Sequence, residues 1–210
     1  MGSKFDRVSQ RLVNELYSNC IVSFDRADLV APKDHSNSNS NSNNRLLSKP
    51  DDRKVKIGFV SKFFGDFEPH GLLLEGVIRH LPRSIFQVYI LPISSSGETA
   101  KYLEDTDSEV VKLTLSYSSN LNKLADLALD IIVYADLNSE PMTHFMSLSR
   151  LAPCQVAFWG NPVTSGNQKI DYFISFDRGE NPYRTLVDTE EEPYSEQGER
   201  NPVPPVSVQI

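Results

Sequence analysis

Apolar positions along the chain alternate between a spacing typical of strands and one typical of helices. Residues 55–61 are rich in β-branched and aromatic side chains and predict a strand. Leucine, valine and isoleucine then recur at helical spacing between Leu72 and Leu81, and Pro82 ends that predicted helix. Residues 86–91 predict the next strand. A strand, a helix and a second strand in this order are typical of parallel pairing, because the helix returns the chain to the edge where the first strand began.

The same alternation continues to about residue 176. The further predicted strands cover residues 110–115, 130–135, 155–159 and 172–176, and the further predicted helices cover residues 121–129 and 141–150. Together these elements predict an α/β fold, a single Rossmann-like domain with a mostly parallel sheet and helices on both faces. Ligands of such sheets bind outside the carboxyl ends of the strands. We therefore expect the site in the loops after Ser61, Tyr134 and Trp159.

The two ends of the chain follow a different pattern from its middle. Residues 5–18 carry apolar side chains at helical spacing and predict an amphipathic helix, whereas residues 35–45 form a Ser/Asn-rich tract that cannot bury enough apolar surface to fold. Residues 178–210 are acidic and proline-rich and predict a disordered tail. We therefore expect an N-terminal helix and linker over residues 1–53, a folded half-domain over residues 54–177, and then the tail.

Composition and charge exclude several classes of function. The 210 residues carry a formal net charge of −7 without a cluster of lysine and arginine, so no nucleic-acid partner is expected. No apolar run reaches membrane-spanning length, so no membrane partner is expected either. Cys20 and Cys154 are far apart and lie in no metal-ligand spacing, which predicts free thiols and no metal site. These features suit a protein of the cytoplasm or nucleus.

The segment with the most candidate chemistry covers residues 152–166. A predicted buried strand ends there in a loop with glycines, hydroxyl side chains and a proline. The candidate residues are Gly160, Pro162, Thr164, Ser165 and Gly166. Glycines let the backbone approach a ligand closely, and hydroxyls and free amides can donate to an anion or to sugar hydroxyls. A tight structural turn with a polar rim explains the same residue types, so both interpretations stay open.

A second candidate segment covers residues 59–71. A predicted strand ends, a loop with glycine follows, and a helix begins near His70. The amino end of a helix beside a strand end favours phosphate, and a histidine there could donate a hydrogen bond or act as an acid or base. A histidine that only caps or packs against the helix is the simpler alternative. The chain has no GxGxxG fingerprint at this place, which argues against a dinucleotide-dependent dehydrogenase.

Two stretches are similar to the catalytic region of the protein O-GlcNAc transferase family. Residues 152–166, with the Asp-Tyr pair at 171–172, resemble that family's Ala-Pro-x-Gln … Gly-x-Pro-x-Thr-Ser-Gly … Asp-Tyr block. The strand at 57–61 and the Phe-Gly pair at 64–65 resemble its opening strand and loop. The similarity runs in the same order from about residue 54 to residue 197.

This resemblance implies the first half of a two-domain GT-B glycosyltransferase. Such enzymes transfer N-acetylglucosamine from the donor UDP-GlcNAc to Ser or Thr of a protein acceptor, without a metal or another cofactor. The family's loop histidine maps onto His70 as the catalytic residue, although Asp66 and Glu68 depart from the family's loop. The implied substrate-binding residues are Gln155, Gly160, Pro162, Thr164, Ser165 and Gly166.

The chain also departs from the family in ways that bear on activity. In the family, the uridine and diphosphate contacts come mainly from a second Rossmann-like domain, and this chain leaves the family pattern after Gln197. No 34-residue helical repeat precedes the folded part. The family also tends to place a glycine after the strand that leads to Asp136 and Asn138. We therefore expect a truncated transferase that is inactive alone. The missing second catalytic domain is an expected partner. The alternatives are a non-catalytic Rossmann-like binding module and an unrelated α/β ligand-binding module.

Overall fold

The computed structural model describes residues 12–13, 16–17, 53–64, 69–93, 106–158 and 165–174. The strands in this part are β1 Val55–Ser61, β2 Phe86–Pro92, β3 Glu109–Val110, β4 Ile131–Tyr134, β5 Cys154–Phe158 and β6 Tyr172–Ile174. The helices are α2 Pro69–His80, α3 Tyr117–Leu127 and α4 Pro141–Ser147.

The strands form one parallel sheet in the order β3-β2-β1-β4-β5-β6. In the middle of the sheet, Val60 of β1 lies beside Leu91 of β2 on one side and Tyr134 of β4 on the other. The chain moves outward from β1 to β3, then returns to the centre and moves outward again through β4, β5 and β6. This is the strand order of doubly wound Rossmann folds, and the direction reverses between β1 and β4. The predicted α/β class with a parallel sheet is confirmed.

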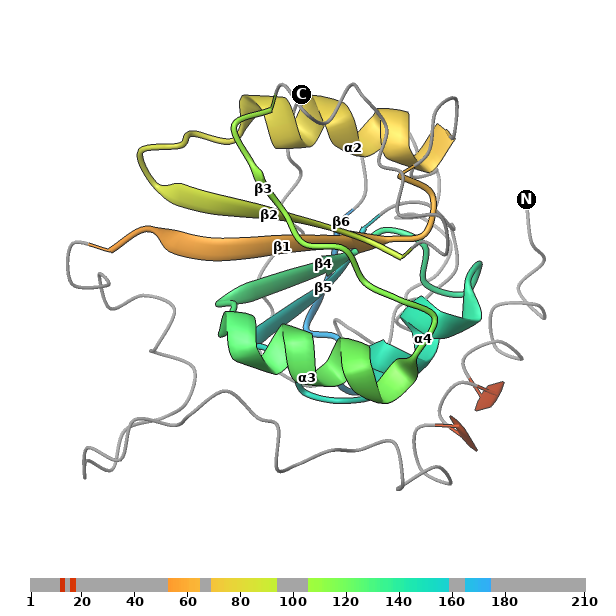
Figure 1. The fold of residues 1–210 in the computed structure, drawn as a ribbon. Helices are drawn as coiled ribbons and strands as arrows, with labels where there is room; N and C mark the ends of the chain where they lie inside the picture. The colour runs from red at the N-terminus through yellow and green to blue at the C-terminus, as the bar shows by residue number, and fades with distance from the viewer. Residues whose placement is uncertain are drawn as a thin grey trace, which may run out of the picture.

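Helices cover both faces of the sheet, as the sequence predicted. Figure 1 shows α2 on one face, and α3 and α4 on the opposite face. The α2 face buries Leu74 and Ile78 against side chains of β1, β2, β4 and β5. The opposite face buries Leu121 and Leu124 of α3 and Met146 of α4. The central strands are therefore buried on both faces, which explains their lack of polar alternation.

Gly58 in β1 leaves room for two leucines on the α3 face. A Cβ at this position would lie 2.6 Å from Cδ1 of Leu129 and 2.8 Å from Cδ1 of Leu91. Leu129 reaches this place because α3 ends at Leu127, and the cap residue Ala128, whose φ of 48° is in the left-handed region, turns the chain back toward the sheet. The packing of Leu91 and Leu129 against β1 therefore depends on the absence of a side chain at residue 58.

The strand predicted over residues 110–115 is shorter than expected. Beyond β3, this segment meets the sheet only through an isolated bridge between Ile93 and Leu113. The Leu113 N–H donates to the carbonyl of Pro92 at 2.8 Å, but Pro92 has no N–H with which to return a bond, so the ladder is incomplete here. The Thr114 backbone bonds to Asn120 instead: Oδ1 of Asn120 accepts from the Thr114 N–H at 2.8 Å, and its Nδ2 donates to the Thr114 carbonyl at 2.8 Å. These side-chain bonds lead the chain into α3.

The other predicted elements agree with the structure where it describes them, except that the helix over residues 141–150 ends at Ser147. Of the predicted N-terminal helix, residues 12–13 and 16–17 are helical. The remainder of that helix, the Ser/Asn-rich tract and the predicted tail lie outside the described residues.

Candidate functional site

Three strand ends meet at the carboxyl edge of the sheet, where the sequence predicts the ligand site. β1 ends at Ser61, β4 at Tyr134 and β5 at Phe158, and the three strands are neighbours. The reversal of direction between β1 and β4 falls within this group. Doubly wound sheets bind ligands in the crevice at such a reversal, so this edge is the candidate site.

Asp136 connects the two loops that follow β1 and β4. Its Oδ2 accepts a hydrogen bond from the backbone N–H of Lys62 at 2.8 Å and another from the Ser61 hydroxyl at 3.2 Å. The hydroxyl oxygen of Ser61 in turn accepts a bond from the backbone N–H of Phe63 at 2.9 Å. Asp136 and Ser61 are fully buried, so these bonds lie away from competing water.

Glu140 makes a second connection between the same loops. Its Oε1 pairs with Nζ of Lys62 at 3.1 Å, and its Oε2 accepts a hydrogen bond from the backbone N–H of Thr143 at 3.0 Å. The second contact caps α4, and Pro141 fills the first helical position, where no N–H is needed. One carboxylate therefore starts α4 and also holds the side chain of Lys62.

Asp136 has one oxygen without a hydrogen bond of ordinary geometry. Its Oδ1 and Oγ1 of Thr143 are both buried and have no hydrogen-bond partner among the described residues, although the Thr143 hydroxyl lies near enough to favour the charged carboxylate. Burial raises the pKa of Asp136 above its ordinary value. The hydrogen bonds from Lys62 and Ser61 and the nearby Thr143 hydroxyl oppose that rise, and the charge of Glu140 adds to it.

His70 is the second residue of α2, the helix that follows β1. Its backbone therefore lies where the sequence predicted the start of this helix. The first turn of α2 contains no acidic residue that would repel an anion, and free N–H groups at a helix start favour one. The side chain of His70 lies outside the described part of the structure, and its catalytic role stays a prediction.

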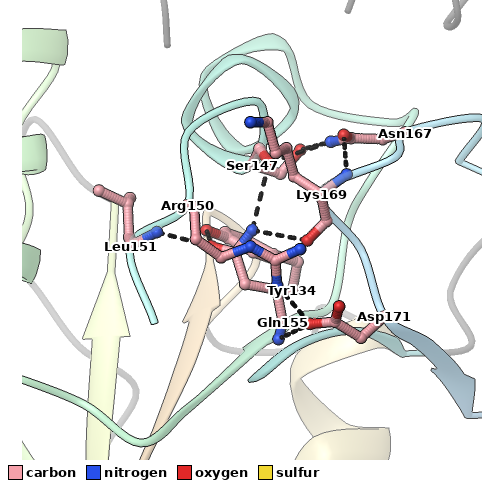
Figure 2. A network of polar contacts seen from close by, with 8 residues as sticks. All are labelled: Tyr134, Ser147, Arg150, Leu151, Gln155, Asn167, Lys169 and Asp171. Atoms are coloured by element: carbon pink, nitrogen blue, oxygen red, sulfur yellow. Dashed lines mark hydrogen bonds and ion pairs between the residues drawn. The ribbon is translucent and has the colours of Figure 1, made fainter. Parts of the chain in front are cut away.

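Gln155 is buried, and both ends of its side-chain amide are bonded within the protein (Figure 2). Oε1 accepts hydrogen bonds from the Tyr134 hydroxyl at 3.2 Å and the Leu151 N–H at 3.1 Å. Nε2 donates to the carbonyl of Lys169 at 2.9 Å and to that of Ser147 at 3.5 Å. Gln155 therefore joins β4, the end of α4 and the segment before β6. Its predicted ligand contact stays a prediction.

Ser165 and Gly166 lie near the same end of α4. Ser165 is buried and its Oγ accepts a hydrogen bond from the Asn167 N–H at 3.2 Å. Nδ2 of Asn167 donates to the carbonyl of Ser147 at 3.0 Å and to its hydroxyl at 2.9 Å. Gly166 has a φ of 60°, in the left-handed region that favours glycine. The other predicted binding residues, Gly160, Pro162 and Thr164, lie outside the described residues.

Asp171 holds the start of β5 and belongs to the Asp-Tyr pair singled out from the sequence. Its Oδ2 accepts hydrogen bonds from Arg150 at 2.5 Å and from the Gln155 N–H at 2.9 Å. Burial raises the pKa of the neighbouring Cys154 thiol to about 12, Asp171 adds to the rise, and Arg150 opposes it. The Cys154 thiol therefore stays protonated, which makes it a poor nucleophile and a poor metal ligand.

The amino edge of the sheet has a separate hollow. A cavity of ≈ 510 Å³ is lined there by charged side chains, among them Lys54, Arg83 and Glu109. Arg83 is engaged within the protein, because it donates to the carbonyls of Thr106 and Asp107 at 2.5 and 3.0 Å. The cavity lies at the starts of β2 and β3, the edge opposite to the one where such sheets bind ligands.

Within the described residues, no group of three or more His, Cys, Asp or Glu side chains could hold a metal ion. In the same part of the chain, no helix is both long and apolar enough to cross a membrane.

The sequence interpretation missed the polar contacts of Lys62, Asp136 and Glu140. Asp136 directly follows the buried strand predicted over residues 130–135. That position at a strand's carboxyl end was the available signal that its carboxylate belongs to the site. The partners could not be found from spacing alone, because Lys62 and Asp136 are 74 positions apart. Only the order of the strands brings them together.

The parallel sheet of this order, with helices on both faces and its candidate site at the carboxyl edge, defines a Rossmann-like α/β protein that resembles the first half of a two-domain GT-B glycosyltransferase. A solved structure of a Thermobaculum terrenum O-GlcNAc transferase mutant matches with a TM-score of 0.54 and 21% sequence identity over 80% of this chain. The match covers 30% of that chain's length. No protein-family model and no curated protein matches this sequence.

Proposed function

We propose that this chain supplies the first half of the catalytic region of a protein O-GlcNAc transferase-like glycosyltransferase. The complete site would transfer N-acetylglucosamine from UDP-GlcNAc to Ser or Thr of a protein acceptor, without a metal. The observation that carries the proposal is that the fold is similar to that of an O-GlcNAc transferase, while residues 152–166 independently resemble that family's block. The fold and the sequence block therefore support the same family.

The chemistry of the carboxyl edge supports this proposal. The amino end of α2 offers free N–H groups to a phosphate, and His70 at that end could exchange a proton or donate a hydrogen bond. In the resembling family, a second Rossmann-like domain closes the donor site. An open half-site neither excludes water nor encloses a diphosphate, so we expect the 210-residue chain alone to be inactive or nearly so.

A transfer assay tests the proposal. The endogenous protein is purified with an antibody against residues 54–177 and incubated with labelled UDP-GlcNAc and Ser/Thr peptides, beside the recombinant 210-residue chain. We expect transfer by the endogenous protein and little or none by the recombinant chain. Absence of transfer in both preparations would contradict the transferase assignment, whereas robust transfer by the recombinant chain would contradict the need for a second domain.

Two histidines at opposite ends of α2 provide a matched pair of variants for this assay, introduced into the gene so that the endogenous protein carries them. His70→Ala is expected to lower kcat about 100-fold, the usual contribution of a general acid or base. His80→Ala is the control, because His80 is exposed at the far end of the helix and its Nδ1 lies 2.6 Å from the Gly76 carbonyl. An unchanged rate in the His70→Ala variant would remove the role proposed for His70.

A further inference from the structure

Two aspartates that flank β4 make similar contacts to β1 at opposite edges of the sheet. At the amino edge, Oδ2 of Asp130 accepts a hydrogen bond from the Lys56 N–H at 2.9 Å. At the carboxyl edge, Oδ2 of Asp136 accepts one from the Lys62 N–H at 2.8 Å. Asp130 is partly exposed and paired with Arg53, whereas Asp136 is fully buried. The two residues therefore form a natural comparison between the edge with the candidate site and the edge without it.

The contacts of Asp136 continue beyond the end of β1. The regular pairing of β1 with β4 stops at Val60 beside Tyr134. Beyond that point, the Lys62 N–H donates to Asp136, and the Phe63 N–H donates to the Ser61 hydroxyl, which itself bonds to Asp136. Side chains thus replace the strand ladder as hydrogen-bond acceptors for this stretch of backbone.

The next residue connects this stretch to the core under α2. Phe64 is 1% exposed and packs in the same cluster as Leu74 and Ile78 of α2. Glu140 adds a third connection through its ion pair with Lys62. Residues 61–64 are therefore fixed from the β4–α4 loop on one side and from the α2 core on the other.

We propose that Asp136, together with Glu140, is a positioning residue for the candidate site. Asp136 fixes the chain where it leaves β1 and so sets the place of the amino end of α2, where His70 lies. The part of this inference that concerns a ligand rests on the proposed function, whereas the part that concerns the backbone does not.

Amide hydrogen exchange measured by NMR on the 210-residue chain tests the inference. In the Asp136→Ala variant, exchange at the Lys62 and Phe63 amides is expected to rise at least about tenfold relative to the core amide of Val133, as for the loss of a hydrogen bond to a charged group. Asp136→Asn is expected to restore protection, because its amide oxygen can still accept both bonds. The control, Asp130→Ala, is expected to change exchange at Lys56 only.

A ligand titration separates this inference from the proposed function. With UDP-GlcNAc as the probe, the Asp136→Ala variant is expected to bind at least about tenfold more weakly, Asp136→Asn to recover most of the affinity, and Asp130→Ala to bind like the wild type. If the wild type binds no UDP-GlcNAc, the donor contacts proposed for this edge of the chain fail, and the exchange data still decide the positioning role.

Two exchange results would overturn the positioning role. One is unchanged protection of Lys62 and Phe63 in the Asp136→Ala variant, and the other is equal loss of their protection in the Asp130→Ala variant. If Asp136→Ala does not fold, Ser61→Ala replaces it. That variant is expected to speed exchange at Phe63 while Lys62 keeps its bond to Asp136, and an unchanged Phe63 amide would count against the inference.

Discussion

At the scale of single residues, backbone positions with special requirements explain much of the local structure. Gly58 has no room for a side chain, as described above, and Asn138 has a φ of 67° in the turn after β4. Asparagine is among the few residues other than glycine that adopt the left-handed region readily. The chain therefore makes this turn without the glycine that the resembling family tends to place there.

The space around Gly58 leads to a stability prediction. Gly58→Ala is expected to lower the free energy of unfolding by about 1–3 kcal/mol, because Leu91 and Leu129 must move to admit the new methyl group. Gly76→Ala is the control, since nothing lies within 4 Å of a Cβ at that exposed helical position. The control should gain about 0.5–1 kcal/mol from better helix propensity. Urea unfolding of both variants measures the difference, and equal stability of the two would contradict the packing described here.

At the scale of the elements, β4 lies between two carboxylates whose pKa values shift in opposite directions. Partial burial by itself raises the pKa of Asp130, but the hydrogen bonds and charges of Arg53 and Lys56 outweigh it and leave the pKa below its ordinary value. Burial dominates at Asp136 and raises the pKa there. Asp130 before β4 and Asp136 after it therefore have opposite effects on the pH dependence of the folding free energy.

These shifts predict opposite slopes of stability with pH. Asp130 stabilises the fold above its unfolded-state pKa, and this contribution is lost as the pH falls through the lower folded-state pKa. Folded Asp136 keeps its proton at pH values where the unfolded residue has lost it, so its contribution falls as the pH rises through that window. Relative to the wild type, Asp130→Asn should become less stable as the pH rises, and Asp136→Asn more stable.

Unfolding free energies measured from acid to neutral pH check this pair of variants. Each variant serves as the control for the other, because both remove one carboxylate next to the same strand. For each variant, the difference from the wild type in unfolding free energy is plotted against pH. If the two plots had slopes of the same sign, burial would not dominate the titration of Asp136.

The elements also show how far the sequence could predict the fold. Apolar spacing predicted the central strands and α2 because their buried faces dominate their composition. It overestimated the strand at 110–115, because Pro92 in the neighbouring β2 has no N–H for the ladder there, and an apolar pattern does not report which residue lies opposite. The parallel class of the sheet was predictable, but the strand order was not.

At the scale of the whole molecule, the candidate site depends on that strand order. The sequence predicted the carboxyl edge and the loops that form it, yet the contact of Lys62 with Asp136 arises only because β4 lies next to β1. Leu72 and Leu73 near the start of α2 are 50% and 37% exposed. The docking of a second domain at this place stays a prediction.

An NMR titration of the ¹⁵N-labelled chain with UDP-GlcNAc decides whether the carboxyl edge is the ligand site. We expect shifts at the Lys62 and Asp136 amides and in the first turn of α2, which saturate at roughly millimolar ligand because the site is open. Shifts confined to the amino-edge cavity around Lys54 and Arg83, or no shifts at all, would contradict this expectation.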